Sequence, residues 1–279
     1  MRLKQAIKKA LYAFKPTFVK VTVAQIQSGV TLKGKKIVIT GGSRGLGRAM
    51  AEKFIAEGAT VLITGKKPEN LEKAKVEINS PLLYIKAFDA ENIVDIPVFF
   101  EYCYGLFGTI DILVSNAGIS LHEGSILNVT PDGFDKTITT NLKSHYFMAK
   151  EFLERKVKKD EEGCLLFIIS KDGYVCNEIP YGLTKASVNS LVGALSTKYY
   201  HCGIRVNAIA PGVTLTDMTR YAKRSNGNMA AENYAGRNFL PEEVAEVACF
   251  LISDASKCVS GQIIFTDGGD HIKSNAEIL

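Results

Sequence analysis

The pentapeptide "YGLTK" places Tyr181 and Lys185 four residues apart. If the segment is helical, residues at this spacing lie on one face, within reach of each other. A phenol titrates near ~10 in water, and a nearby ammonium group favours its ionised form. The pair is therefore either a solvated contact on a helix surface or a phenol that can exchange a proton in a reaction.

A glycine-rich segment, "TGGSRGLG" at residues 40–47, joins an apolar β-branched run to a helical pattern. Gly41, Gly45 and Gly47 follow the spacing G-x-x-x-G-x-G, which differs from the dinucleotide fingerprint G-x-G-x-x-G. The physical use is the same, because glycine permits a tight turn and a helix N-terminus offers unpaired N–H groups to an anion. The segment predicts a nucleotide phosphate site in a first βαβ unit.

The end of the next apolar run reads "TGKK", at residues 64–67. An acid at this position would bind a ribose 2′-hydroxyl and favour NAD. Gly65 stands there instead, followed by Lys66 and Lys67, and Arg44 in the glycine-rich segment adds a third cation. With no carboxylate expected beside these cations, the sequence predicts NADP(H) in preference to NAD(H). The alternative is that the two lysines form an ordinary solvated turn.

Strand and helix patterns alternate from residue 36 to the end without a break in composition. This alternation predicts an α/β fold, a single doubly wound, Rossmann-type domain with a seven-stranded parallel sheet and helices on both faces. Ligands then bind at the carboxyl ends of the strands. The expected strands lie within residues 35–42, 60–65, 82–89, 110–118, 164–170, 203–212 and 261–269. The expected helices lie at 44–59, 68–78, 98–108, 131–157, around 181–185 and at 241–253.

We expect the first 33 residues to form a basic extension ahead of the Rossmann-type domain at 34–279. Nine of the 34 basic residues and none of the 29 acidic ones lie before residue 37, so the rest carries a net charge of −4. This distribution argues against a nucleic-acid footprint over the whole domain. Leu3, Ile7, Leu11 and Phe14 share one stripe of an expected helix at 3–14. We expect this helix to pack on the body or on a partner subunit; contact with an anionic membrane surface and a frayed segment are the alternatives.

Hydrophobic residues make up 46% of the chain and charged residues 23%, which is typical of globular proteins. No apolar run approaches the ~20 residues that span a bilayer. The six cysteines are scattered, and the four histidines (122, 145, 201 and 271) show no ligand spacing. We therefore expect reduced thiols, a cytoplasmic location and no bound metal.

Several collinear motifs between about Gly34 and Gly269 resemble the short-chain dehydrogenase/reductase family in its single-domain form. "TGGSRGLG" resembles the cofactor loop, and "YGLTK" the Y-x-x-x-K motif. "SNAG" at 115–118 resembles N-N-A-G, with Ser115 in place of the first asparagine, and "APGVTLT" at 210–216 resembles the P-G segment. Asn141 in "TTNLKSHYF" and Ser170 at the end of "LLFIIS" match two further catalytic positions.

The resemblance implies hydride transfer between a nicotinamide and a carbonyl carbon. Tyr181 would be the proton donor or acceptor, Lys185 would lower its pKa and hold the nicotinamide ribose, Ser170 would orient the substrate oxygen, and Asn141 would hold a water next to Lys185. Structural roles, as a strand-end cap for Ser170 and a backbone-bonding helix residue for Asn141, are the alternatives. The implied cofactor-binding residues are Gly41, Ser43, Arg44, Gly45, Leu46, Gly47, Lys66, Lys67, Asp89 (at the adenine), Ala90, Asn116, Ala117, Gly118, Tyr181, Lys185, Pro211, Gly212, Val213 and Thr216 (at the carboxamide).

The segment at 217–240 is where this family places its substrate lid, and it is polar, with Arg220, Lys223 and Arg224 close together. We expect a polar or anionic ketone, of the sugar, polyol or 3-oxoacyl type, and by analogy a homodimer or homotetramer. Lys171 and Asp172 replace the usual small residues beside Ser170. The alternative function is a non-catalytic nucleotide-binding scaffold or regulator, anchored by the basic N-terminal helix.

Overall fold

The computed structural model describes residues 29–219 and 234–272, in which β-strands and α-helices alternate along the chain. The strands form one parallel sheet in the order β3-β2-β1-β4-β5-β6-β7. The strands are β1 (Lys36–Ile39), β2 (Thr60–Gly65), β3 (Leu83–Ala87), β4 (Ile112–Ser115), β5 (Gly163–Ile168), β6 (Ile204–Pro211) and β7 (Ile263–Thr266). This confirms the predicted doubly wound sheet. Strands β2 and β3 are added on one side of β1 and strands β4 to β7 on the other, so the strand order reverses between β1 and β4.

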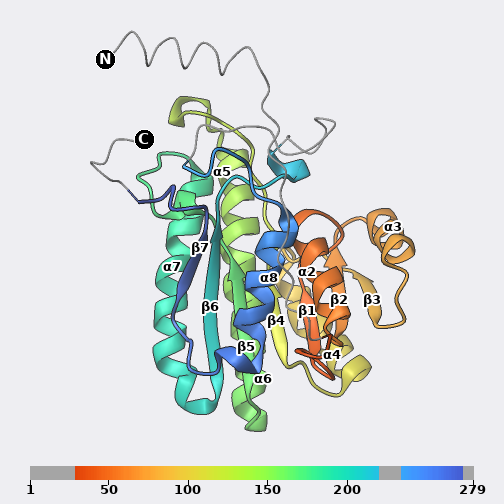
Figure 1. The fold of residues 1–279 in the computed structure, drawn as a ribbon. Coiled ribbons are helices and arrows are strands. Elements are labelled where there is room, and N and C mark those ends of the chain that lie inside the picture. Colours follow the sequence, from red (N-terminus) through yellow and green to blue (C-terminus); the bar gives the residue numbers. More distant parts are fainter. Residues whose placement is uncertain (1–28, 220–233, 273–279) are drawn as a thin grey trace.

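Helices cover both faces of the sheet (Figure 1). They are α2 (Gly45–Ala56), α3 (Pro68–Ile78), α4 (Ile96–Phe107), α5 (Pro131–Ile138), α6 (Ser144–Lys159), α7 (Pro180–Tyr199) and α8 (Pro241–Ile252). Pro68, Pro131, Pro180 and Pro241 each occupy the first turn of a helix, where the missing N–H costs nothing. The crossover topology therefore brings the carboxyl ends of the strands and the loops after them to one edge of the sheet.

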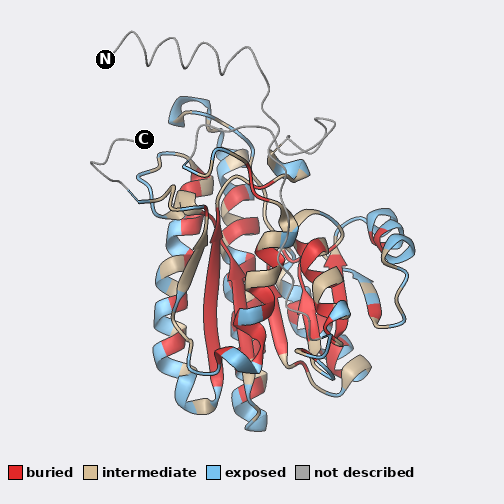
Figure 2. Ribbon diagram, in the orientation of Figure 1, coloured by how far each residue is buried: buried red, intermediate tan, exposed pale blue. Residues whose placement is uncertain are grey.

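Two apolar layers make up the core, one on each side of the sheet. On one side Phe54 of α2 and Val244 of α8 pack against alternate strand residues such as Ile39. On the other side Phe100 of α4 and Phe152 of α6 pack against the intervening strand residues. Because parallel strands are covered on both faces, they are apolar almost throughout, as the buried central strands in Figure 2 show.

The long helix predicted at 131–157 is divided in the structure. A π-helical turn, Thr139–Lys143, separates α5 from α6 without interrupting the helical path. A π-turn accommodates one extra residue, and such turns occur frequently at functional sites. Here the turn contains Asn141, whose side chain is fully buried.

The expected helix at 3–14, with the contacts predicted for it, lies outside the described residues, as do Arg220, Lys223 and Arg224. Within residues 29–219 and 234–272, no helix combines the length and the apolar character needed to cross a bilayer.

Candidate active site

The glycine-rich loop between β1 and α2 is folded tightly enough to exclude side chains. Gly41 and Gly45 have φ angles of +67° and +55°, in the left-handed region that favours glycine. A Cβ atom at Gly47 would overlap the carbonyl oxygen of Gly41 and lie 2.6 Å from Nδ2 of Asn116. The first N–H groups of α2, which begins at Gly45, are therefore accessible to a phosphate.

Asn116, directly after β4, holds this loop against the neighbouring strand. Its Nδ2 donates hydrogen bonds to the carbonyl oxygens of Thr40, at 2.9 Å, and Gly41, at 3.0 Å. The Thr40 hydroxyl in turn accepts from the backbone N–H groups of Asn116 and Ala117, at 2.9 and 3.1 Å. The "SNAG" segment therefore fixes the position of the glycine loop relative to β4.

Lys185 is buried behind the loop, with 4% of its surface exposed. Its Nζ donates a hydrogen bond to the carbonyl oxygen of Ile168, at 3.1 Å, and lies 5.7 Å from the centre of the Tyr181 ring. No carboxylate among the described residues forms an ion pair with it, and burial lowers the pKa of its ammonium group to about 8. Tyr181 and Lys185 are thus not a solvated surface pair.

Burial also governs Tyr181, on the same face of α7. Within the protein alone it raises the pKa of the phenol to about 12, against a smaller lowering by the side-chain hydrogen bond with Ser170 and a small raising by the Asp172 carboxylate. The expected net lowering of the Tyr181 pKa is therefore wrong for the protein alone, although the Lys185 ammonium lies close enough to favour the phenolate. The reason is that losing water around the phenol destabilises the phenolate more than the hydrogen bond with Ser170 stabilises it.

Asn141 lies on the far side of Lys185, on the π-turn. Its Oδ1 accepts from the backbone N–H of Ile119 and its Nδ2 donates to the carbonyl oxygen of the same residue, both at 2.8 Å. A Cβ atom at Gly118 would lie 3.4 Å from Oδ1 of Asn141 and 3.6 Å from Nζ of Lys185. The structure therefore brings Asn141, Lys185 and the end of the "SNAG" segment together.

A cavity of about 410 Å³ runs from the glycine loop to Tyr181. It is lined by Ser170 and by eighteen of the nineteen predicted cofactor residues, all except Val213. Val213 instead accepts a backbone hydrogen bond from Phe239, at 2.9 Å, and Asn141 lies behind the wall. One continuous cavity thus joins the glycine-rich loop to the group around Tyr181.

The predicted 2′-phosphate cations are not free of carboxylates. Lys66 Nζ lies 2.6 Å from Glu91 Oε1 and 3.3 Å from Asp89 Oδ1, and Arg44 lies 3.6 Å from Asp217. The premise that no carboxylate faces these cations is therefore wrong. The strands β2 and β3 pair in register at their ends, Gly65 opposite Ala87, and so bring the loop at 88–91 alongside Lys66.

Ser115, which departs from the N-N-A-G pattern, has a structural partner. Its hydroxyl forms a hydrogen bond with Nδ1 of His145 on α6, and both side chains are buried. Burial, together with the nearby positive charge of Lys185, lowers the pKa of the imidazole to about 3. His145 is therefore neutral at physiological pH and ties β4 to α6 behind the site.

The loop after Ser170 is held by β7 and by the segment that follows it. Lys171 forms an ion pair with Asp270, and Tyr174 packs edge-on against Phe265. Burial raises the pKa of Asp172, whose backbone N–H donates to the Ser170 hydroxyl at 3.2 Å. Of the two unusual residues expected to border the substrate, Lys171 is thus already paired.

Sequence reasoning missed several residues that line the cavity. Glu91 comes from a segment that carries no recognised motif, Thr140 directly precedes Asn141 in "TTNLKSHYF", and the backbone carbonyl of Ile168 accepts the hydrogen bond from Lys185. The position of Glu91, two residues after Asp89, is the one signal that could have shown it, given the pairing of β2 with β3. Among the residues that the structure describes, no group of three or more His, Cys, Asp or Glu side chains is placed to hold a metal.

Comparison with known proteins decides the family. A family model described as Enoyl-(Acyl carrier protein) reductase matches residues 41–271. The chain is a member of the short-chain dehydrogenase/reductase family. It is therefore an oxidoreductase, as the resemblance implied, and the fold agrees with those of solved family members.

Three proteins that are similar to this chain carry names with substrates of two kinds. A 3-oxoacyl-[acyl-carrier-protein] reductase of Aquifex aeolicus is 34% identical over 86% of this chain and 98% of the relative. An L-rhamnose 1-dehydrogenase (NADP(+)) of Thermoplasma acidophilum is 32% identical over 85% of this chain and 96% of the relative. The crystal structure of a 3-ketoacyl-(acyl-carrier-protein) reductase from Brucella melitensis, complexed with NADH, has a TM-score of 0.78 at 29% identity and covers 86% of this chain and 100% of its own.

Proposed function

We propose that the protein is an NADP(H)-dependent carbonyl reductase or alcohol dehydrogenase that acts on a polar or anionic ketone. The observation that carries this proposal is the cavity that joins the glycine loop to Ser170, Tyr181 and Lys185. The residues present fit a dinucleotide, because the glycines leave room for a pyrophosphate next to the N-terminus of α2. When bound, the dinucleotide supplies or accepts the hydride at C4 of its nicotinamide ring.

The proton is handled by the chain's own side chains. Tyr181 stays protonated at neutral pH, since its pKa is raised to about 12. It can therefore donate a proton to the oxygen of a carbonyl substrate as that oxygen gains charge. Ser170, hydrogen-bonded to Tyr181, is in position to orient the same oxygen. Lys185 places a buried positive charge near the phenol, which stabilises the phenolate left behind.

Asn141 and Ile119 complete the group as positioning residues. With both polar atoms of its side chain bonded to Ile119, Asn141 holds the segment after β4 next to Lys185. The proposed water next to Lys185 would then bond to backbone oxygens in this region. The preference for NADP(H) is supported by Lys66, Lys67 and Arg44 in the cavity wall and by the NADP(+) in the name of the rhamnose dehydrogenase.

A substrate of the sugar, polyol or 3-oxoacyl type is supported by the relatives, which are named for a sugar and for acyl-carrier-linked ketones. A cytoplasmic location is supported by six cysteines without a disulfide, three of them buried. A homodimer or homotetramer is supported by exposed apolar side chains on the outer faces of α4 and α6, among them Val98, Tyr102 and Tyr146.

The experiment is consumption of NADPH with a panel of ketones: a keto sugar, a 3-oxoacyl thioester and a neutral apolar ketone. We expect turnover of the first two, and a Tyr181→Phe variant that binds NADPH normally but turns over about 10²–10⁴-fold more slowly. A Tyr102→Phe variant, which removes an exposed hydroxyl on α4, is the matched control and should retain full activity. Undiminished turnover by Tyr181→Phe would contradict the mechanism, and equal turnover of all three ketones would contradict the substrate class.

A further inference from the structure

Glu91 occupies the end of the cavity where Lys66 lies. Its Oε1 atom lies 2.6 Å from Nζ of Lys66, and the same oxygen accepts a hydrogen bond from the hydroxyl of Thr140. The side chain of Glu91 is 21% exposed, whereas that of Lys66 is 47% exposed. The carboxylate is therefore the more buried partner of this ion pair.

The backbone around Glu91 is fixed by its neighbour. The Asp89 side chain accepts a hydrogen bond from the backbone N–H of Glu91, at 2.9 Å. The backbone N–H of Asn92 donates to the carbonyl oxygen of Asp89, at 3.0 Å, and closes the turn that contains Glu91. The Thr140 hydroxyl, on the π-turn, also lies 2.8 Å from the carbonyl oxygen of Lys136, so its single proton is shared between that oxygen and Glu91. Glu91 is thus held from two sides, by the loop after β3 and by the π-turn.

The two carboxylates next to Lys66 reduce the attraction of this lysine for an added phosphate. The ammonium of Lys66 is surrounded by two carboxylates, so the group of three carries a net charge of −1 at neutral pH. Asp89 is 43% exposed and 3.3 Å away, so its attraction is more strongly screened by water than that of Glu91. Of the two acids, Glu91 is the stronger competitor for the lysine.

We infer that Glu91 is a specificity-determining residue that weakens binding of a 2′-phosphate by holding Lys66 in a competing ion pair. The inference rests on the proposed binding of a nicotinamide dinucleotide. A 2′-phosphate must draw Lys66 away from Glu91 before it gains the full attraction of the ammonium group. A dinucleotide with a free 2′-hydroxyl can bind while Lys66 stays paired with Glu91. Glu91 therefore narrows the difference in affinity between NADPH and NADH that the three cations would otherwise create.

The test is fluorescence titration of NADPH and NADH against four forms of the full chain: unsubstituted, Glu91→Gln, Lys66→Met and the double variant. Glutamine keeps an oxygen that can accept from Thr140 and Lys66, but it removes the charge. Glu151→Gln is the matched control, because Glu151 pairs with Arg155 at 2.7 Å on α6, has a 15% exposed side chain and is not among the cavity-lining residues.

We expect Glu91→Gln to tighten NADPH binding about fivefold, the upper range for a partly exposed ion pair, and to leave NADH binding within about twofold. In the Lys66→Met background the same substitution should change NADPH binding less than about twofold, and Glu151→Gln should change neither affinity. These are binding measurements, so they do not depend on which ketone is reduced.

Two results would overturn the inference. One is an NADPH affinity that Glu91→Gln leaves unchanged or weakens. The other is equal tightening with and without Lys66, which would mean that Glu91 repels the phosphate directly. Failure of the proposed function gives different results. Either the unsubstituted protein binds neither dinucleotide, or it binds both and the Tyr181→Phe variant loses no activity.

Discussion

The ammonium group of Lys185 lies 3.1 Å from the carbonyl oxygen of Ile168, and this backbone atom is its hydrogen-bond acceptor. A single neutral acceptor replaces only part of the hydration that a buried ammonium loses. The pKa of Lys185 accordingly falls from an ordinary value of 10.5 to about 8. The buried charge of Lys185 therefore lowers the free energy of unfolding.

We therefore predict that Lys185→Met stabilises the protein at pH 7 while it abolishes most turnover. Removing the buried charge should raise the free energy of unfolding by roughly 3 kcal/mol, because each unit of the pKa shift from 10.5 to about 8 corresponds to about 1.4 kcal/mol. Between pH 8 and about 10.5 the unfolded chain binds the proton that the folded chain has lost, so the stability of the unsubstituted protein rises with pH. The advantage of the variant should shrink over that window.

Thermal unfolding at pH 7 and pH 10 measures both effects. Lys150→Met, at an exposed lysine paired with Glu154 on the outside of α6, is the control and should change the melting temperature little. A Lys185→Met variant less stable than the unsubstituted protein at pH 7 would refute the view that this charge is costly.

Asn141→Ala should lose both stability and activity. The substitution removes two partly buried hydrogen bonds to Ile119 and leaves its backbone groups without these partners, which costs about 1 kcal/mol for each lost bond. The segment before Ile119 should then shift next to Lys185, with turnover at least about tenfold lower. Urea unfolding and steady-state kinetics measure the two losses. Asn128→Ala, which removes one exposed bond to Glu123, should leave activity intact.

Gly47→Ala should prevent dinucleotide binding. Its methyl group would overlap the carbonyl oxygen of Gly41 and press on Asn116, so the loop and α2 must separate. Gly193→Ala on α7 is the matched control: nothing lies within 4 Å of its Cβ position, and alanine should stabilise that exposed helical site by about 0.5–1 kcal/mol. NADPH titration with circular dichroism separates lost binding from lost fold. Normal binding by Gly47→Ala would show that the loop has room that the structure does not.

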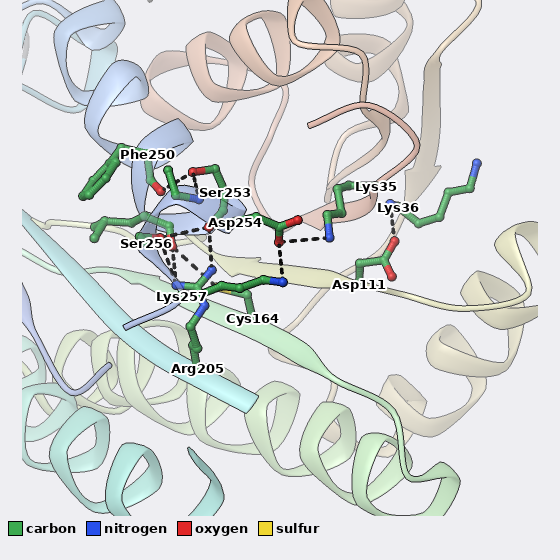
Figure 3. Close-up of polar contacts among 12 residues, drawn as sticks. Lys35, Lys36, Asp111, Cys164, Arg205, Phe250, Ser253, Asp254, Ser256 and Lys257 are labelled. Carbon is green, nitrogen blue, oxygen red and sulfur yellow. Dashed lines mark hydrogen bonds and ion pairs between the residues drawn. The ribbon is translucent and has the colours of Figure 1, made fainter. Parts of the chain in front are cut away.

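Arg205→Met should destabilise the protein without affecting the chemistry. The buried guanidinium of Arg205 on β6 donates to the carbonyl oxygens of Leu251, at 2.7 Å, and Ser253, at 3.1 Å, and to the Ser256 hydroxyl, at 3.1 Å (Figure 3). These bonds satisfy groups at the C-terminal end of α8, where a positive charge is also favoured by the helix dipole. We expect a loss of about 3 kcal/mol or more, because several bonds to a charged group are lost.

Arg205→Lys should recover only part of that stability, since an ammonium cannot span the same set of acceptors. Urea unfolding measures both variants, and kcat of folded Arg205→Lys should remain within about twofold of the unsubstituted value. If Arg205→Met were as stable as the unsubstituted chain, the proposed anchoring of α8 would be wrong.

The strands could be predicted because each lies in a short, mostly apolar run that is followed by glycine or a polar residue, and this signal is local in the sequence. Gly41, Tyr181 and Lys185 could be placed for the same reason, since their spacing is local. The π-turn at Thr139–Lys143 could not, because one extra residue barely disturbs a helical pattern.

Relations between distant segments were also beyond reach. The ion pair of Lys66 with Glu91 depends on the register of β2 against β3, and this register cannot be read from the sequence. The raised pKa of Tyr181 depends on how completely the surrounding chain excludes water, whereas the i, i+4 spacing shows only that a lysine is near.

The π-turn has one consequence for how this protein can change over generations. Deleting a single residue from Thr139–Lys143 would restore ordinary α-helical geometry and leave the packing register of α6 on the sheet unchanged. The same deletion would rotate Asn141 away from Ile119 by about the angle that one helical residue subtends. Losing one codon would therefore leave α6 on the sheet while the chain loses the two Asn141–Ile119 hydrogen bonds, and we expect such a chain to be less stable and to have lost the positioning next to Lys185.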